Sequence, residues 1–141
     1  MIRVLSQQEI VELYEMRIVL EETAAQMAAK HTSKAEIHTL ETMNAQMMQA
    51  ASDPNKVVTL NRKFHTCILS AAHNRFLAQS HSSLSNSLVL LGKTTLESAE
   101  RVKDVVAQYD AIIAALKSGK AEIAAKMMRT HMQASLEGVA T

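Results

Sequence analysis

The sequence predicts an all-α fold, an antiparallel bundle of about six helices that forms one domain over residues 1–141. Three observations predict it. Only three glycines and one proline occur, whereas the strong helix formers Ala, Met, Leu, Gln, Glu and Lys are abundant. Apolar residues recur at steps of three and four along most of the chain. Aromatic residues are only 3% of the total, which indicates an aliphatic, Met-rich core. This composition favours a helical bundle over a β-sandwich.

Two S-x-x-E capping boxes mark the starts of the first two helices. Ser6 and Glu9 open a helix that should end near Lys30, and Ser33 and Glu36 open the next. The apolar face of the first helix is expected to hold Ile10, Leu13, Leu20, Ala24 and Met27. That of the second is expected to hold Ile37, Leu40, Met43, Met47 and Ala50.

The third and fourth helices are separated from their neighbours by turn-forming sequences. The stretch SDPN at 52–55 precedes a helix over about 56–72, because proline fits a turn or a first helical turn. The stretch HNR at 73–75 ends that helix. A fourth helix is expected from about Phe76 to about Leu91, with a break or kink at Gly92. The apolar face of the third helix holds Val57, Leu60, Phe64, Ile68 and Ala72.

The fifth helix is expected over about 96–117 and the sixth from about Ala121. Gly119 lies just after the fifth helix, the usual position of a C-terminal glycine. The buried side of the fifth helix should hold Val102, Val105, Val106, Tyr109, Ile112, Ile113 and Leu116. That of the sixth should hold Ile123, Ala124, Met127, Met128, His131 and Ala134.

Composition also narrows the function classes. Lys and Arg number 15 against 14 Asp and Glu, so the chain has no electrostatic reason to bind nucleic acid or a membrane surface. No apolar run reaches the ~20 residues that span a bilayer, and the N-terminal residues contain no signal-peptide core. The one cysteine fits a cytoplasmic protein.

Five polar side chains interrupt the apolar faces: Arg17, Asn61, His65, Tyr109 and His131. Burying a polar group without a partner costs on the order of 1–3 kcal/mol, and an unpaired charge costs more. One such group per domain is ordinary. Five on four different helices indicate a shared polar pocket inside the bundle.

Two interpretations of these residues stay open at this point. Asn61 and His65 lie one helical turn apart and could hold one cation or one ligand, although a single core histidine is more often structural. Arg17 needs an anion, which could be Glu21 one turn on or the carboxylate of a ligand. The motifs of phosphate-binding loops, metalloproteases and serine hydrolases are absent, so the sequence does not predict an enzyme.

Three segments together resemble a known family. They are ELYEMRIVLEETAAQMAA (12–29), LNRKFHTCILSAAHNRFL (60–77) and QYDAIIAALKSGKAEIAAKMMRTHM (108–132). Their order and spacing resemble the FCD domain, the C-terminal effector-binding domain of FadR-type regulators in the GntR family. The resemblance implies an all-helical domain that binds a small organic acid and forms a homodimer in the cytoplasm.

In many members of that family one Asp and three His hold a divalent metal that binds the carboxylate of the effector. The matching positions here are Asn61, His65, Tyr109 and His131, with Arg17 as a further partner for a carboxylate. Asparagine and tyrosine are poorer metal ligands than aspartate and histidine at neutral pH. We therefore expect effector binding through hydrogen bonds and Arg17. A divalent metal such as zinc on His65, His131 and Asn61 is the alternative.

The family's winged helix-turn-helix domain precedes the segment that begins near residue 4, so we expect no operator binding by this chain alone. DNA would be bound through that missing domain of a parent protein. A ligand-free helical dimerisation scaffold is the second interpretation. A small enzyme that uses His65 or His131 as a general base is the third.

Overall fold

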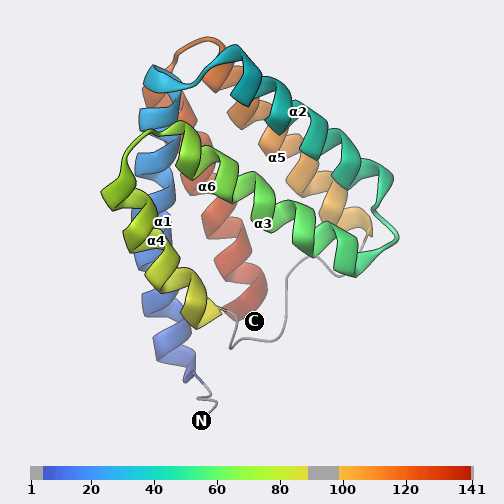
Figure 1. The fold of residues 1–141 in the computed structure, drawn as a ribbon. Coiled ribbons are helices and arrows are strands. Elements are labelled where there is room, and N and C mark those ends of the chain that lie inside the picture. Colours follow the sequence, from blue (N-terminus) through green and yellow to red (C-terminus); the bar gives the residue numbers. More distant parts are fainter. Residues whose placement is uncertain (1–4, 89–98, 141) are drawn as a thin grey trace.

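The computed structural model describes residues 5–88 and 99–140, with side chains placed for 5–84 and 100–136. Regular structure in these ranges is entirely helical, as Figure 1 shows. The helices are α1 (Gln7–His31), α2 (Lys34–Gln49), α3 (Pro54–Ala71), α4 (Arg75–Leu88), α5 (Ala99–Lys117) and α6 (Ala121–Ala140). The predicted all-α bundle of about six helices is confirmed. Among the described residues, no helix combines the length and the apolarity that crossing a membrane requires.

Helix α1 lies at the centre of the contacts between helices. It packs along α6 and also contacts α3, α4 and α5, while α2 packs against α3 and α5 (Figure 1). Short turns join α1 to α2, α2 to α3, α3 to α4 and α5 to α6, and of these pairs α2 with α3 and α5 with α6 pack extensively. A side chain on the inner face of α1 can therefore meet side chains from most of the bundle.

Helix starts follow the capping residues. The Glu9 amide donates to Ser6 Oγ at 3.1 Å and the Ser6 amide to Glu9 Oε1 at 3.0 Å. The second capping box pairs Ser33 and Glu36 in the same way. Helix α3 begins at Pro54, two residues earlier than predicted, because the side chain of Asp53 caps it and proline occupies the first turn.

The later turns also follow local chemistry. Asn74 Oδ1 accepts from the amides of Phe76 and Leu77, both at 3.1 Å, so α4 begins at Arg75. Gly119 has φ +66°, a conformation that favours glycine, and ends α5 as predicted. The expected end of the fourth helix near Leu91, the break at Gly92 and the start of the fifth helix at 96 lie outside the described residues.

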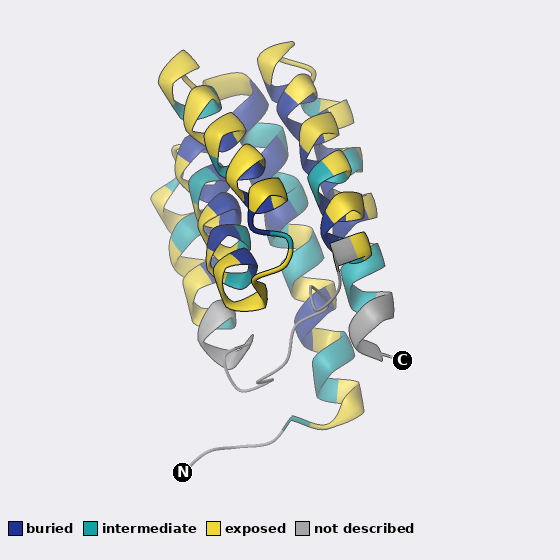
Figure 2. Cartoon of the chain, turned by 90° about the vertical axis from the view of Figure 1, so that its right-hand side faces the viewer, coloured by how far each residue is buried: buried dark blue, intermediate teal, exposed yellow. Residues whose placement is uncertain are grey.

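The apolar stripes face one continuous core, and the exposed positions lie on the outer sides of the helices (Figure 2). The largest fully buried side chains include Tyr109, Phe64, Leu40, Met47, Ile68, Ile112, Leu116, Met128 and Met132. One expected core residue is wrong: Ile123 is 44% exposed. The inward face of α6 instead follows Ala124, Met128 and His131, at steps of four and three, and Ile123 lies outside it.

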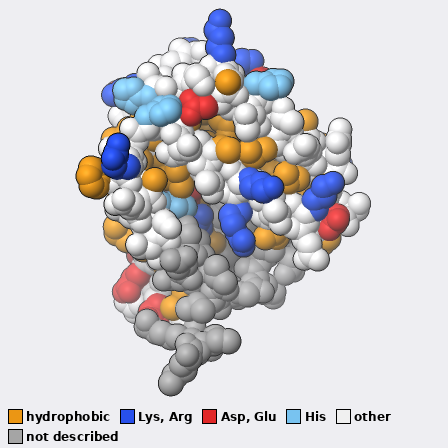
Figure 3. All heavy atoms as spheres, viewed as in Figure 1, with side chains coloured by type: hydrophobic (Ala, Val, Ile, Leu, Met, Phe, Trp, Pro, Cys, Tyr) orange, Lys and Arg blue, Asp and Glu red, His pale blue; other side chains and the backbone are white. Residues whose placement is uncertain are grey.

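Charge is mixed on the surface as well as in the composition. On the face that carries α2, α3 and α4, Lys and Arg side chains are spaced among apolar and uncharged atoms (Figure 3). The larger apolar side chains that remain exposed include Met16, Val19, Met48 and Phe76.

Candidate functional site

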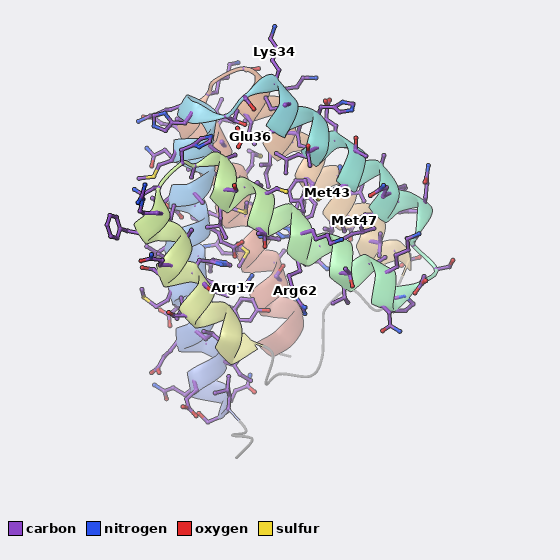
Figure 4. The ribbon with its side chains drawn as sticks, in the orientation of Figure 1. Arg17, Lys34, Glu36, Met43, Met47 and Arg62 are labelled. Atoms are coloured by element: carbon purple, nitrogen blue, oxygen red, sulfur yellow. The ribbon has the colours of Figure 1, made fainter. Side chains whose placement is uncertain are left out.

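Polar side chains from five helices meet inside the bundle. Those that the structure brings together, here called the polar cluster, are Arg17 and Glu21 of α1, Asn61 and His65 of α3, His81 of α4, Gln108 and Tyr109 of α5, and His131 of α6. All five residues predicted from periodicity belong to it. Figure 4 shows Arg17 beside α4, which packs on α1.

Glu21 is the anionic centre of the polar cluster and is only 1% exposed. Its carboxylate lies 3.0 Å from Arg17 Nη2, 3.7 Å from His81 Nε2 and in direct contact with His65 Nδ1. Burial alone would raise the pKa of Glu21, but the charges of His65 and Arg17 outweigh it. The pKa of Glu21 is therefore well below its ordinary value of 4.5, and the carboxylate is ionised at neutral pH.

His65 connects Glu21 to Tyr109 and Asn61. The Tyr109 hydroxyl donates to Asn61 Oδ1, and its oxygen lies 2.6 Å from His65 Nε2. The Nδ1–H donates to Glu21, which can only accept. His65 thus links a buried carboxylate to a buried phenol through its two ring nitrogens.

Tyr109 is completely buried and stays neutral. Burial, together with the nearby charge of Glu21, raises the pKa of Tyr109 well above 10. Its ring stacks on Phe64, with centroids 3.9 Å apart. The phenol is therefore fixed in place as a hydrogen-bonding group and is not available as an anion.

His131 closes the polar cluster from α6. Its ring centroid lies 4.7 Å from that of Tyr109 and 5.4 Å from that of His65, and its Nδ1 lies 2.5 Å from Gln108 Oε1. Burial and the neighbouring charge of His65 lower the pKa of His131 from 6.5 to about 3. His131 is thus neutral at physiological pH and donates from Nδ1 to Gln108.

The donor chemistry of the polar cluster does not suit a tightly held divalent metal. Both nitrogens of His65 are used in hydrogen bonds, the phenol of Tyr109 keeps its proton, and Asn61 offers only a neutral amide oxygen. Within the described ranges, no three His, Cys, Asp or Glu side chains are grouped so that they could hold a metal ion. Metal binding by His65, His131 and Asn61 stays a prediction for metal analysis of the purified protein.

A surface hollow of about 370 Å³ lies elsewhere, between α2 and α5. Its walls include Asn44, Met48, Val106, Asp110 and Lys117, none of which belongs to the polar cluster. Asn44 Nδ2 donates to Asp110 Oδ1 at 2.7 Å and to the Val106 carbonyl at 3.1 Å. This contact joins α2 to α5, and we assign it a structural role.

Three members of the polar cluster were not predicted as site residues. The sequence patterns predict Glu21 only as a possible partner of Arg17 and assign no role to His81 or Gln108. Two of them had a sequence signal. Glu21 lies four residues after Arg17 and three before the buried Ala24, and His81 lies four after the buried Leu77. Both positions therefore continue a buried helical face.

Comparison with known proteins decides the family. The sequence profile of the FCD domain matches residues 12–134. The chain belongs to the FCD family. Among solved structures, E. coli McbR/YncC superposes on this FCD domain with a TM-score of 0.82 and 18% sequence identity, over 95% of this chain and 69% of that one. This similarity shows a shared fold. No curated protein sequence matches the chain.

The resemblance seen in the three sequence segments is thus confirmed. Asn61, His65, Tyr109 and His131, the four positions to which the sequence resemblance pointed, lie in one cluster. They are joined by hydrogen bonds and ring contacts, and Glu21 supplies the negative charge at their edge.

Proposed function

We propose that this FCD domain binds a small organic acid at the polar cluster and thereby controls DNA binding by a GntR/FadR-type transcriptional regulator. Membership of the FCD family supports an effector-binding role in such a regulator. One observation carries the choice of site: eight polar side chains from α1, α3, α4, α5 and α6 meet in the interior. A ligand that altered their contacts would act on five helices together.

The chemistry of the polar cluster suits an acid. Arg17 presents N–H donors with positive charge, which form strong hydrogen bonds to carboxylates, and His65 adds an N–H donor beside it. Tyr109 and Asn61 offer a hydroxyl and an amide that can hold polar groups elsewhere on the ligand. This mode of binding needs no metal, in keeping with the donor set described above.

Control of DNA binding would follow from a shift in helix packing. A ligand changes an equilibrium only by the difference between its affinities for the two states. Because His65 and Tyr109 belong to α3 and α5, an acid that separated them would favour a different packing of those helices. DNA would be bound by a winged helix-turn-helix domain of the parent regulator, which places the protein in the cytoplasm.

The same proposal includes a homodimer. Met16 and Val19 on α1 are 50% and 54% exposed, and Phe76 at the start of α4 is 73% exposed. Helices α1 and α4 contact one another, and we propose that their exposed apolar side chains contact a second copy of the chain.

A ligand-free scaffold is the second candidate, and one observation favours it: the cluster residues hydrogen-bond or ion-pair with one another. Such pairing also stabilises a core that binds nothing.

A catalytic role is less well supported. His131, with a pKa of about 3, is a weak base, and both nitrogens of His65 are already engaged.

Thermal unfolding in the presence of small carboxylates tests the proposal. An effector that binds the folded state should raise the melting temperature with a saturating dependence on concentration. His65→Gln should abolish the shift, whereas Arg129→Ala, which removes a surface ion pair with Glu22, should leave it intact. Absence of any shift across mono-, di- and hydroxy-acids would favour the scaffold.

A further inference from the structure

We propose that Glu21 is a built-in carboxylate that fills the acid-binding position of the polar cluster, and that an organic acid binds by taking its place. The inference rests on the proposed function and adds how the site is kept closed. Glu21 then acts as a tethered competitor of the effector.

The contacts of Glu21 are those that a bound acid would need. One oxygen accepts from His65 Nδ1–H, and the other lies 3.0 Å from Arg17 Nη2 and 3.7 Å from His81 Nε2. With 1% of its surface exposed, the side chain blocks this position completely. An acid that left Glu21 in place would have to find other donors.

The charge of the site also favours an acid that displaces Glu21 over an acid that binds beside it. Two buried carboxylates side by side repel strongly, and enclosed like charges are among the costliest arrangements in a protein. Replacing Glu21 with one external carboxylate keeps the charge of the site unchanged. Arg17 and His65 would then face one anion both before and after binding.

The fit between Glu21 and Arg17 is imperfect, which gives a free acid an advantage. The two residues lie four apart on α1, and their side chains form an ion pair in which Glu21 Oε2 has no hydrogen-bond geometry. Arg17 Nε is buried and has no hydrogen-bond partner among the described atoms. A carboxylate free of the α1 backbone can bind the Nε and Nη2 edge of the guanidinium with both oxygens.

This arrangement sets the affinity by competition. The apparent affinity for the effector equals its intrinsic affinity multiplied by the fraction of molecules in which Glu21 has left the site. Removing the competitor should therefore tighten binding without any new contact to the ligand.

Chemical rescue tests the inference with acetate as the probe. Glu21→Ala removes a methylene and a carboxylate, which together correspond to acetate, and leaves Arg17 and His65 in place. Sodium acetate, compared with sodium chloride at equal ionic strength and constant neutral pH, should stabilise Glu21→Ala at concentrations about tenfold or more below those that act on the wild type. Glu22→Ala, which loses a surface carboxylate paired with Arg129, should respond as the wild type does.

Glu21→Gln is the second variant. It keeps the volume of the side chain and should therefore still fold if the alanine variant does not. It should bind acetate at least about tenfold more tightly than the wild type in calorimetric titration. Equal acetate responses in the wild type and in the Glu21 variants overturn the inference, even if the wild type binds an acid from the panel. Rescue by acetate in a protein whose wild type binds no acid of the panel upholds the built-in carboxylate and contradicts the proposed effector instead.

Discussion

The ring of Phe64 stacks on the ring of Tyr109, with centroids 3.9 Å apart and planes 6° from parallel. Phe64 precedes His65 in the sequence of α3, so the same turn of helix both supports the phenol ring and accommodates its hydrogen-bond partner. Packing of the Tyr109 ring against Phe64 limits the movement of the whole side chain and so helps to hold its hydroxyl beside His65. The polar cluster is therefore positioned by the apolar core beside it.

Tyr109→Phe should keep this stacking and lose the hydroxyl. His65 Nε2 and Asn61 Oδ1 would then lack the partner that joins them. Leaving buried polar groups unpaired costs about 1–3 kcal/mol, so the free energy of unfolding measured in urea should fall by that amount. A change below a few tenths of a kcal/mol would mean that the hydroxyl is not held as described.

The free energy of unfolding should decrease as the pH falls below neutrality, because the buried imidazole of His131 is neutral in the folded state. The unfolded chain takes up a proton at this residue near pH 6.5 and the folded chain only near 3, so protonation favours the unfolded state. The contribution is fully present above 6.5 and declines by at most about 1.4 kcal/mol per pH unit below it. Glu21, whose folded pKa is lowered, adds a second loss only as the pH falls below about 4.5.

Urea unfolding at a series of pH values checks this. His131→Gln should flatten the dependence between pH 6.5 and 4.5, whereas His38→Gln, at an exposed position on α2, should not. Identical profiles for the wild type and His131→Gln would contradict the burial of a neutral imidazole.

Asn44 should matter for stability through its link between α2 and α5. Asn44→Ala removes donors to Asp110 Oδ1 and to the Val106 carbonyl and should cost about 1–3 kcal/mol. Gln46→Ala, at an exposed position two residues on, is the matched control and should cost less than about 0.5 kcal/mol. Equal losses in the two variants would show that the contact contributes nothing.

The apolar surface on α1 and α4 should hold the dimer. Phe76→Glu places a charge on a side chain that is 73% exposed, and it should shift the protein from dimer to monomer in light scattering. Met48→Glu, on α2 and 43% exposed, should leave the dimer intact. Dissociation by Met48→Glu alone would move the interface to α2.

The fold was largely predictable because each signal was local. The capping residues Ser6 and Ser33, Pro54 and Gly119 act within a few residues of themselves, and the structure places them at helix ends. The predicted burial of Ile123 is wrong because α6 packs on α1 and α5 through the face that carries Ala124 and Met128.

The sequence predicts which residues belong to the polar cluster better than it predicts which of them contact one another. Periodicity placed Asn61, His65 and Tyr109 on inner faces, and the structure joins them. Periodicity could not show that Glu21 takes the central position, because an i, i+4 pair such as Arg17 and Glu21 also forms on exposed helix faces. Which of several inward groups meet depends on how the helices pack, and that is decided by contacts distant in sequence.

The central claim is that an acid binds at His65, and imidazole signals in a ¹H–¹⁵N spectrum test it most directly. The acid that gives the largest thermal shift should move the signals of His65 and His131 along a saturating curve. Those of His31 and His38, both at exposed positions, should stay in place and serve as internal controls. Saturable binding of that acid with the His65 signal unmoved would contradict the account.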